Sequence, residues 1–241
     1  MLKILESVIK MDAGERGELA DMLDRISLKG LLKITKLIEE RYEIYQRLKD
    51  IVIENEKVSY ESEVQGLIEE NLWVIDEAYN LVVSEEADFE EALRKLLEQR
   101  GQSSEEISID DKDKNKEMDI FACRQKNDGD GIQHLVLELK RPSVTINRDQ
   151  WLQLDTYKNV ILREARFNSK DAVWKFYLIG NKLGDFIAAQ KKALASYGDK
   201  DLIFIDTDSN FRGYALTWSQ VFDRFKIRHD HLKEQLELSI N

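Results

Sequence analysis

The segment Met118–Tyr157 constrains the fold more than any other part of the chain. A first apolar run begins at Met118, and a second, Leu135–Leu139, follows the turn-forming sequence Asn127–Gly131. Turn residues between two apolar runs predict an antiparallel β-hairpin. After the hairpin, residues recur at 3- and 4-residue spacing up to Tyr157, which predicts that a helix follows it. We therefore expect a strand, a turn, a strand and a helix to form one packed unit.

Three charged residues fall at one end of the predicted hairpin. Asp119 lies near the start of the first run, and Glu138 and Lys140 lie at the end of the second. Side chains alternate along a strand, so Glu138 and Lys140 point to the same face. Because a hairpin brings the start of one strand beside the end of the other, we expect Asp119 close to both. Two carboxylates and an amine suit a magnesium ion, a water and a phosphate.

This ordered set resembles a known nuclease motif. Asp119 followed by Glu138-x-Lys140 is similar to the motif of the PD-(D/E)xK nucleases, the restriction-endonuclease-like superfamily. Gln153-x-x-x-Tyr157, in the next predicted helix, is similar to the extra motif of the RecB-type branch of that superfamily. Met118 stands where the family motif has its proline. In the family, that proline only shapes the start of the strand.

An upstream helix extends the resemblance. The segment Glu61–Tyr79, which contains Glu69–Trp73, resembles the entry helix of Shedu-type anti-phage nuclease domains. Similar domains occur at the C-terminus of GHKL-type ATPases. The resemblance covers roughly residues 61 to 183 and implies a cytoplasmic, metal-dependent deoxyribonuclease that acts in anti-phage or mobile-element defence.

The resemblance also implies roles for the residues at the end of the hairpin. Asp119 and Glu138, with the backbone carbonyl of Leu139, would hold one or two Mg²⁺ ions, with Mn²⁺ as an alternative. Lys140 would orient or activate the attacking water and stabilise the transition state. These residues form the predicted catalytic and metal site.

Three further residues are matched to the site by the same resemblance. Gln153 and Tyr157 lie one helical turn apart, so they face the same way and would position the metal site or the strand. Glu63 matches the glutamate of the entry helix and would be a third or outer-sphere metal ligand. The alternative for Glu63 is a solvated helix glutamate, since its neighbours Glu61, Glu69 and Glu70 are acidic too.

The charge distribution bears on nucleic-acid binding. The formal net charge of −11 argues against a protein that coats nucleic acid in general. Basic residues nevertheless outnumber acidic ones around the helix after the hairpin, and we expect Arg141, Arg148 and Lys158 to contact a phosphate backbone. The alternative is that these side chains form an ordinary solvated helix surface.

The remaining periodicity predicts an α/β fold in which a mixed β-sheet is flanked by helices, with an N-terminal helical annex. We expect the annex to cover residues 1–58 and the nuclease-like domain to cover 59–241. Within that domain we expect a strand at 79–83 and a helix at 85–100. No run of about 18 apolar residues is present, so we expect no membrane span. The lone cysteine, Cys123, excludes an internal disulfide and is typical of a reducing cytosol.

The annex carries an apolar stripe at helical spacing, made of Leu31, Ile34, Ile38, Tyr45, Leu48 and Val52. This stripe either packs on the chain's own domain or joins two copies in a homodimer, which we predict. The resemblance to ATPase tails also suggests a piece of a longer protein, with an ATPase domain or partner subunit.

Two other function classes stay open beside the nuclease. In one, the same fold carries a weak site and binds nucleic acid for an attached ATPase. In the other, the helices assemble the protein and the α/β domain is a scaffold. Duplex DNA, single-stranded DNA and RNA all remain open as substrates, as do endonucleolytic and exonucleolytic cutting.

Overall fold

The computed structural model describes residues 2–54, 61–76, 79–99, 109, 117–125, 132–164, 166, 172–206 and 210–235. The chain divides into two compact units, Met1–Ile44 with Lys233–Asn241, and Tyr45–Leu232. Helix α3 (Leu28–Lys49) runs through the division. The boundary between these compact units lies inside a helix, at Tyr45, whereas the sequence predicts a helical annex that ends at residue 58.

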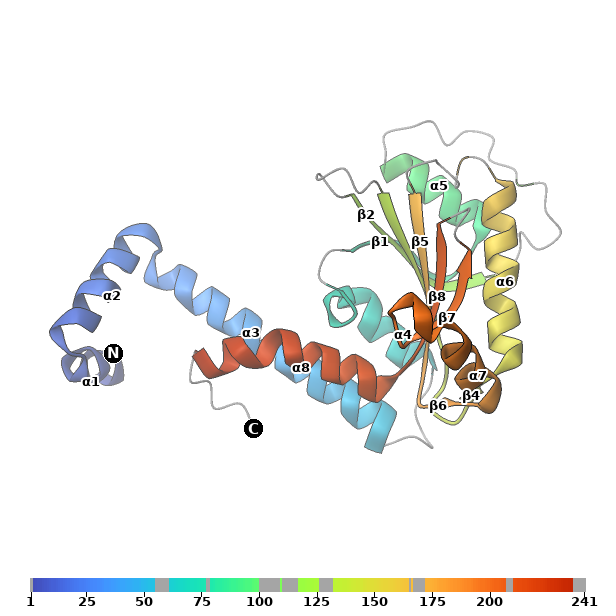
Figure 1. Cartoon of the computed structure of the whole chain (residues 1–241). Coiled ribbons are helices and arrows are strands. Elements are labelled where there is room, and N and C mark those ends of the chain that lie inside the picture. Colours follow the sequence, from blue (N-terminus) through green and yellow to red (C-terminus); the bar gives the residue numbers. More distant parts are fainter. Residues whose placement is uncertain are drawn as a thin grey trace. The chain divides into compact units, whose positions relative to one another are not determined.

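The N-terminal unit is helical (Figure 1). Helices α1 (Leu2–Lys10) and α2 (Ala13–Arg25) precede the first part of α3. Helix α2 begins at a capping box, in which the Glu15 backbone N–H donates to Asp12 Oδ1 at 2.9 Å and the Asp12 N–H donates to Glu15 Oε2 at 2.8 Å. These two bonds satisfy N–H groups that a helix start would otherwise leave open.

The second unit is built on a mixed six-stranded sheet with the strand order β1-β2-β3-β5-β8-β7. Its strands are β1 (Asn80–Asp88), β2 (Glu117–Gln125), β3 (Ile132–Leu139), β5 (Ala172–Gly180), β7 (Leu202–Asp206) and β8 (Phe211–Thr217). The pairs β1–β2, β2–β3 and β7–β8 are antiparallel, and β3–β5 and β5–β8 are parallel. This confirms the predicted α/β class and the predicted hairpin of β2 and β3.

Helices cover both faces of the sheet. They are α4 (Glu61–Glu70), α5 (Phe89–Gln99), α6 (Arg148–Arg163), α7 (Asp185–Leu194) and α8 (Trp218–Gln235). Figure 1 shows α5 and α6 on one side of the sheet and α4 on the other. Short elements complete the unit: a π-helix (Asp50–Glu54), 3₁₀ turns at Leu72–Val74 and Ala195–Tyr197, and a two-stranded sheet of β4 (Thr145–Ile146) and β6 (Lys182–Leu183). Among the described residues, no helix is both long and apolar enough to cross a bilayer.

The first strand is longer than the sequence predicts. It continues to Asp88, and α5 begins only at Phe89. The reason is a cap: Asp88 Oδ1 accepts a hydrogen bond from the Glu91 backbone N–H at 2.9 Å. An aspartate at this position favours a helix start directly after it, so the helix expected at 85–100 is shortened at its N-terminus.

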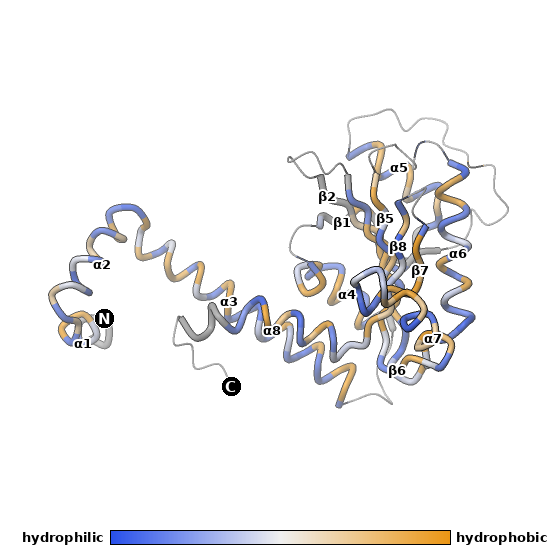
Figure 2. Tube along the Cα trace, viewed as in Figure 1, coloured by the Kyte–Doolittle hydropathy of each residue, from blue (hydrophilic) through white to orange (hydrophobic). Residues whose placement is uncertain are grey.

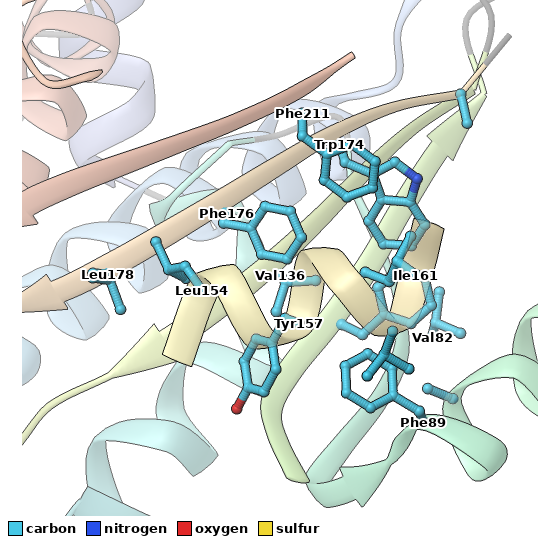
Figure 3. Packing of buried hydrophobic residues seen from close by; sticks show 14 of the residues in the cluster. Val82, Phe89, Val136, Leu154, Tyr157, Ile161, Trp174, Phe176, Leu178 and Phe211 are labelled. Atoms are coloured by element: carbon cyan, nitrogen blue, oxygen red, sulfur yellow. The ribbon is translucent and has the colours of Figure 1, made fainter. Parts of the chain in front are cut away.

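The core lies between the sheet and the helices α5 and α6, and is rich in aromatic rings (Figure 3). Trp174 stacks on Phe211 with ring centroids 5.8 Å apart and on Phe121 at 5.6 Å. His134 stacks on Trp174 at 4.2 Å and is fully buried. His134, which lies on β3 itself, is therefore a core residue. Rings of this size provide much of the burial that stabilises such a unit.

The apolar stripe of α3 has two fates. In its C-terminal half, which belongs to the α/β unit, Leu48 and Val52 are completely buried and Tyr45 stacks on Phe225 at 4.9 Å. In its N-terminal half, Ile34 is 48% exposed. Ile38, in the middle of the stripe, is only 7% exposed, so the stripe is exposed at Ile34 and covered from Ile38 onward.

A buried charged network closes the far edge of the sheet. Asp201 is almost inaccessible to solvent, and its carboxylate accepts hydrogen bonds from Lys191 Nζ at 3.0 Å, Gln220 Nε2 at 2.8 Å and Arg224 Nη2 at 2.7 Å. These donors come from α7 and α8. Paired in this way, a buried carboxylate joins both helices to the sheet.

Candidate active site

The register of the hairpin places the two predicted carboxylates opposite each other. Ile120 pairs with Leu137 and Phe121 pairs with Val136 across β2 and β3. One residue further along, the same register sets Asp119 against Glu138. Phe121 and Val136 both belong to the core beneath α6. By strand alternation, Asp119 and Glu138 therefore point to the α6 side as well.

Asp119 is held at both its side chain and its backbone. Its Oδ2 accepts a hydrogen bond from the Leu139 N–H at 2.6 Å, which ties the carboxylate to the end of β3. Its backbone carbonyl accepts a hydrogen bond from Gln65 Nε2 on α4 at 3.1 Å. Gln65 is buried. The start of β2 is thus fixed from the opposite face of the sheet.

Sequence reasoning did not identify Gln65. A signal was available, because Gln65 lies three residues before Ile68, on the apolar stripe of α4. A glutamine on a buried stripe needs a hydrogen-bond partner inside the protein, and the Asp119 carbonyl is that partner.

Glu138 is the centre of the site. Its side chain is 3% exposed, and its Oε1 accepts hydrogen bonds from Lys140 Nζ and, at 2.7 Å, from Gln153 Nε2. Its Oε2 accepts one from the Tyr157 hydroxyl at 3.1 Å, and Gln153 Nε2 also lies 2.8 Å from that hydroxyl oxygen. Four of the predicted site residues therefore form one hydrogen-bonded group.

Electrostatics at Glu138 reflect two opposing causes. Burial raises the pKa of the Glu138 carboxyl above its ordinary value, because a charged group is poorly solvated there. The charge and hydrogen bond of Lys140, and the hydrogen bonds of Tyr157 and Gln153, oppose this rise. Burial and the neighbouring Glu138 charge raise the pKa of the Tyr157 hydroxyl, so it remains a proton donor to the carboxylate.

Helix α6 carries Gln153 and Tyr157, and its start is fixed by the small β4–β6 sheet. Asn147 caps the helix, and its N–H donates to Gln150 Oε1 at 2.8 Å. Gly184, after β6, donates its N–H to the Ile146 carbonyl at 2.8 Å. A β-carbon at Gly184 would lie 2.7 Å from Asn147 Cγ, so a larger residue there would displace the cap. Glycine at this position allows α6 to begin beside the site.

The ring of Tyr157 anchors the other end of this group. It is completely buried and meets Phe89 edge to face, with ring centroids 5.5 Å apart. In Figure 3 the ring lies beside the core side chains, with its hydroxyl oxygen directed away from the Trp174 cluster. Because core packing holds the ring, the hydroxyl that contacts Glu138 is preorganised.

The structure does not bring Glu63 into this group. Glu63 and Gln65 are two residues apart on α4, so their side chains diverge by about 200°. Gln65 faces Asp119, whereas the Glu63 side chain is 46% exposed and its carboxylate lies 4.0 Å from Arg47. Glu63 therefore lies on the exposed side of α4, as its alternative interpretation expects, and Gln65 is the residue of this helix that contacts Asp119.

The three basic residues predicted to contact DNA lie in different environments. Arg141 and Arg148 are exposed near the end of β3 and the start of α6. Lys158 has a 16% exposed side chain, lies 3.1 Å from Asp155 and sits 4.8 Å from the centre of the Phe204 ring. Lys158 therefore already has two partners within the fold, whereas Arg141 and Arg148 are exposed.

A hollow of about 300 Å³ lies on α6, lined by Asp149, Leu152, Gln153 and Thr156. Gln153 both lines this hollow and contacts Glu138, so the hollow adjoins the buried carboxylate. Gln153 thus connects a surface hollow on α6 with the buried Glu138 carboxylate.

The donor set fits a hard divalent cation. Asp119 and Glu138 are carboxylates, and the Leu139 carbonyl is a third oxygen at the same strand end, as Mg²⁺ and Mn²⁺ prefer. Each carboxylate oxygen has two lone pairs, so Glu138 Oε2 keeps capacity beyond its bond to Tyr157. Within the described residues, no cluster of three or more His, Cys, Asp or Glu side chains suits a metal. Any ion here would rest on two carboxylates and backbone oxygen.

Comparisons with protein-family models, with curated proteins and with solved structures find no match to this chain.

Proposed function

We propose that this protein is a metal-dependent nuclease that hydrolyses DNA phosphodiester bonds at the Asp119–Glu138–Lys140 site. The single observation that carries the proposal is the arrangement of these residues at one strand end. Asp119 bonds the backbone of Leu139, and Glu138 is held by Lys140, Gln153 and Tyr157. An acidic pair next to a lysine matches the chemistry needed to cut a phosphodiester.

The two carboxylates and the Leu139 carbonyl would hold Mg²⁺ or Mn²⁺. When bound, the ion lowers the pKa of water and neutralises charge on the phosphate. The protein's own contribution is to keep the carboxylates in place. Gln65 supports the Asp119 backbone, and Tyr157 and Gln153 fix the Glu138 carboxylate. Such outer contacts commonly decide how well a ligand set works.

Lys140 is the candidate cation for the transition state. Its Nζ contacts Glu138 Oε1, and its side chain is 16% exposed. It can therefore turn toward a phosphate at the mouth of the site, where a positioned donor stabilises developing negative charge. Arginine would be a poor substitute, because the planar guanidinium is larger and distributes its charge.

Arg141 and Arg148 are the residues proposed to hold the DNA backbone. Both are exposed and lie near the end of β3 and the start of α6. Phosphate contacts of this kind position a duplex without reading its sequence. The net charge of −11 opposes DNA binding by the surface as a whole, so binding depends on local basic residues such as these two.

A second candidate is a module that binds nucleic acid without cutting it. The observation that favours it is the enclosure of Glu138, whose carboxylate is buried and ion-paired with Lys140. If that pair persists when DNA is present, the amine and the carboxylate neutralise each other. The cleavage experiment below separates this module from the nuclease.

The biological setting follows from the resemblance of the motif to Shedu-type domains and to ATPase tails. We propose defence against phage or mobile-element DNA in the cytoplasm, with an ATPase domain or subunit as partner. This part of the proposal rests on sequence likeness, and a plaque assay with the parent and Lys140→Ala proteins tests it directly.

The test of the site is plasmid cleavage with Mg²⁺, Mn²⁺ or a chelator, on circular and linear DNA. We expect Asp119→Ala, Glu138→Ala and Lys140→Ala each to lower the cleavage rate by at least about 100-fold. The first two would remove metal ligands, and the third would remove the cation that stabilises the transition state. Circular dichroism and thermal melting then establish that the variants remain folded.

Lys191→Ala is the matched control. Lys191 has a 17% exposed side chain and pairs with a buried carboxylate, as Lys140 does, but at the far edge of the sheet. Its removal should alter stability and leave the cleavage rate per folded molecule unchanged. Binding without metal-dependent cleavage would favour the second candidate, and equal cutting by the parent and Lys140→Ala proteins would remove the site assignment.

A further inference from the structure

Uncovered apolar side chains are concentrated in the N-terminal unit. Of the eleven strongly exposed large apolar side chains in the described residues, seven lie between Ile9 and Leu37. They are Ile9, Leu23, Ile26, Leu28, Leu32, Ile34 and Leu37. None of the residues of α2 is buried. Exposed apolar surface gathered in one region of a protein marks an interaction surface.

We call α2, its connection to α3 and the first turns of α3 (residues 13–37) the helical corner. Figure 2 shows apolar and hydrophilic residues side by side along both of its helices. The connection consists of Ile26 and Ser27 only. Because α2 remains uncovered, the apolar side chains of the two helices do not bury each other within one chain.

The two arms of the helical corner carry opposite charge. The segment Asp12–Ile26 has five acidic and two basic residues, a net charge of −3. The segment Ser27–Ile38 has three lysines, Lys29, Lys33 and Lys36, and no acidic residue, a net charge of +3. The exposed apolar surface is therefore bordered by acid on one helix and by base on the other.

The start of α3 also places charge against its helix dipole. Its first turn contains Lys29 and no acidic residue, although the N-terminal end of a helix favours negative charge. Helix α2 follows its own dipole, with Glu15 in its first turn and Arg25 in its last turn. An acidic partner along the start of α3 would relieve the arrangement there.

We infer that the helical corner binds a second copy of this chain, with α2 of each protomer against the start of α3 of the other. A two-fold axis near the Ile26–Ser27 connection makes both contacts equivalent, as in most symmetric dimers. Helix α2 has 13 residues and is about 20 Å long, close to the roughly 15 Å of residues 28–37. The same surface supplies both partners, so the charges complement each other without a further component.

This interface is separate from the part of α3 that is buried in the α/β unit. Leu48 and Val52 pack inside that unit, so they are unavailable to a partner. The dimer would join two candidate active sites in one assembly, which suits cutting both strands of a duplex. The interface itself does not depend on the proposed nuclease activity.

Charge reversal tests the interface in the full chain by sedimentation velocity. We expect the parent protein to be a dimer at tens of micromolar, and the triple variant Lys29→Glu, Lys33→Glu, Lys36→Glu to raise the dimer Kd by roughly 100-fold, since symmetry counts each reversed lysine twice. The variant Glu18→Lys, Asp21→Lys, Asp24→Lys should do the same. Mixing the two variants should restore dimers, now of one copy of each.

The control variant reverses the charge of three exposed lysines of the α/β unit, Lys192, Lys200 and Lys226. It should sediment as a dimer, like the parent protein. Restoration by mixing excludes misfolding as the cause of monomers. A monomeric parent protein, or a dimer insensitive to both triple variants, would overturn the inference. A monomer that binds anionic lipid vesicles through Lys29, Lys33 and Lys36 would assign the surface to a membrane instead.

Discussion

Trp174 in the α/β unit and Leu32 in the helical corner are both large apolar side chains, yet 1% of the first is exposed and 56% of the second. Trp174 contacts aromatic rings from three strands. Leu32 lies on a helix whose neighbours in sequence do not cover it. Strand alternation at Trp174 and helical periodicity at Leu32 both predict an apolar face, but only the α/β unit provides a surface large enough to bury one.

The charges differ between the two regions in the same way. Asp201 is buried and held by three donors from neighbouring helices. In the helical corner, Asp21 and Lys29 lie on exposed surface. The buried charge of Asp201 therefore serves the internal structure of the α/β unit, whereas the exposed charge of the corner is available to a partner.

The largest expected effect tests the difference in burial. Trp174→Ala should lower the free energy of unfolding by about 3–5 kcal/mol, because it removes a large side chain from a packed core. Chemical denaturation followed by tryptophan fluorescence measures this, since Trp73, Trp151 and Trp218 remain in the α/β unit. Leu32→Ala is the control, and should change the same quantity by less than about 0.5 kcal/mol in the dilute monomer. Equal costs for the two variants would contradict the comparison.

A smaller effect tests the buried charge. Burial by itself raises the pKa of Asp201, but hydrogen bonds from Lys191 and Gln220, with the charges of Lys191 and Arg224, bring that pKa below its ordinary value. A carboxyl whose pKa is lower in the folded than in the unfolded state stabilises the fold at a pH above the unfolded-state pKa, which is near 4. This contribution is lost as the pH falls from there through the folded-state pKa. Asp201→Asn should therefore cost about 1–3 kcal/mol at pH 7 and flatten the fall in stability below pH 4.

The measurement is the free energy of unfolding in urea from pH 7 to pH 3. Asp21→Asn on α2 is the matched control, because the same residue type is exposed there and should leave the pH dependence unchanged. The prediction fails if, below pH 4, the free energy of unfolding falls no more steeply for the parent protein than for Asp201→Asn. The network would then contribute nothing to folding.

The smallest expected effect compares the two sides of α4 within the α/β unit. Gln65→Met removes the hydrogen bond to the Asp119 carbonyl and should weaken Mg²⁺ binding, measured by calorimetry without DNA, by about 10-fold. The cleavage rate should fall with KM for DNA nearly unchanged. Glu63→Gln, on the exposed side of the helix, should change neither quantity. If Glu63→Gln weakened Mg²⁺ binding and Gln65→Met did not, Glu63 would be the metal ligand.

Local pattern was enough for most of the candidate site. The hairpin of β2 and β3, and the helix that carries Gln153 and Tyr157, follow from turn residues and apolar periodicity in one continuous segment. Once the hairpin forms, its register alone brings Asp119 beside Glu138. The order of helices and strands along the α/β unit was predictable for the same reason, because each element has its own apolar repeat.

Contacts between distant segments were not predictable in this way. Whether Gln65 or Glu63 faces Asp119 depends on the rotation of α4 against β2. The contact of Lys158 with the Phe204 ring joins residues 46 positions apart. Sequence spacing gives the faces of a helix, but it does not say which face meets which neighbour.

The α/β class, the hairpin and the acidic pair with its lysine could be predicted from residue patterns, because these depend on short-range periodicity and on residue chemistry. The position at which α3 passes from one unit to the other depends on tertiary packing. Leu31, Ile34, Leu48 and Val52 belong to one helical stripe, yet only the last two meet a surface that buries them completely. Burial depends on what lies opposite a side chain, and a helical repeat carries no information about its neighbour.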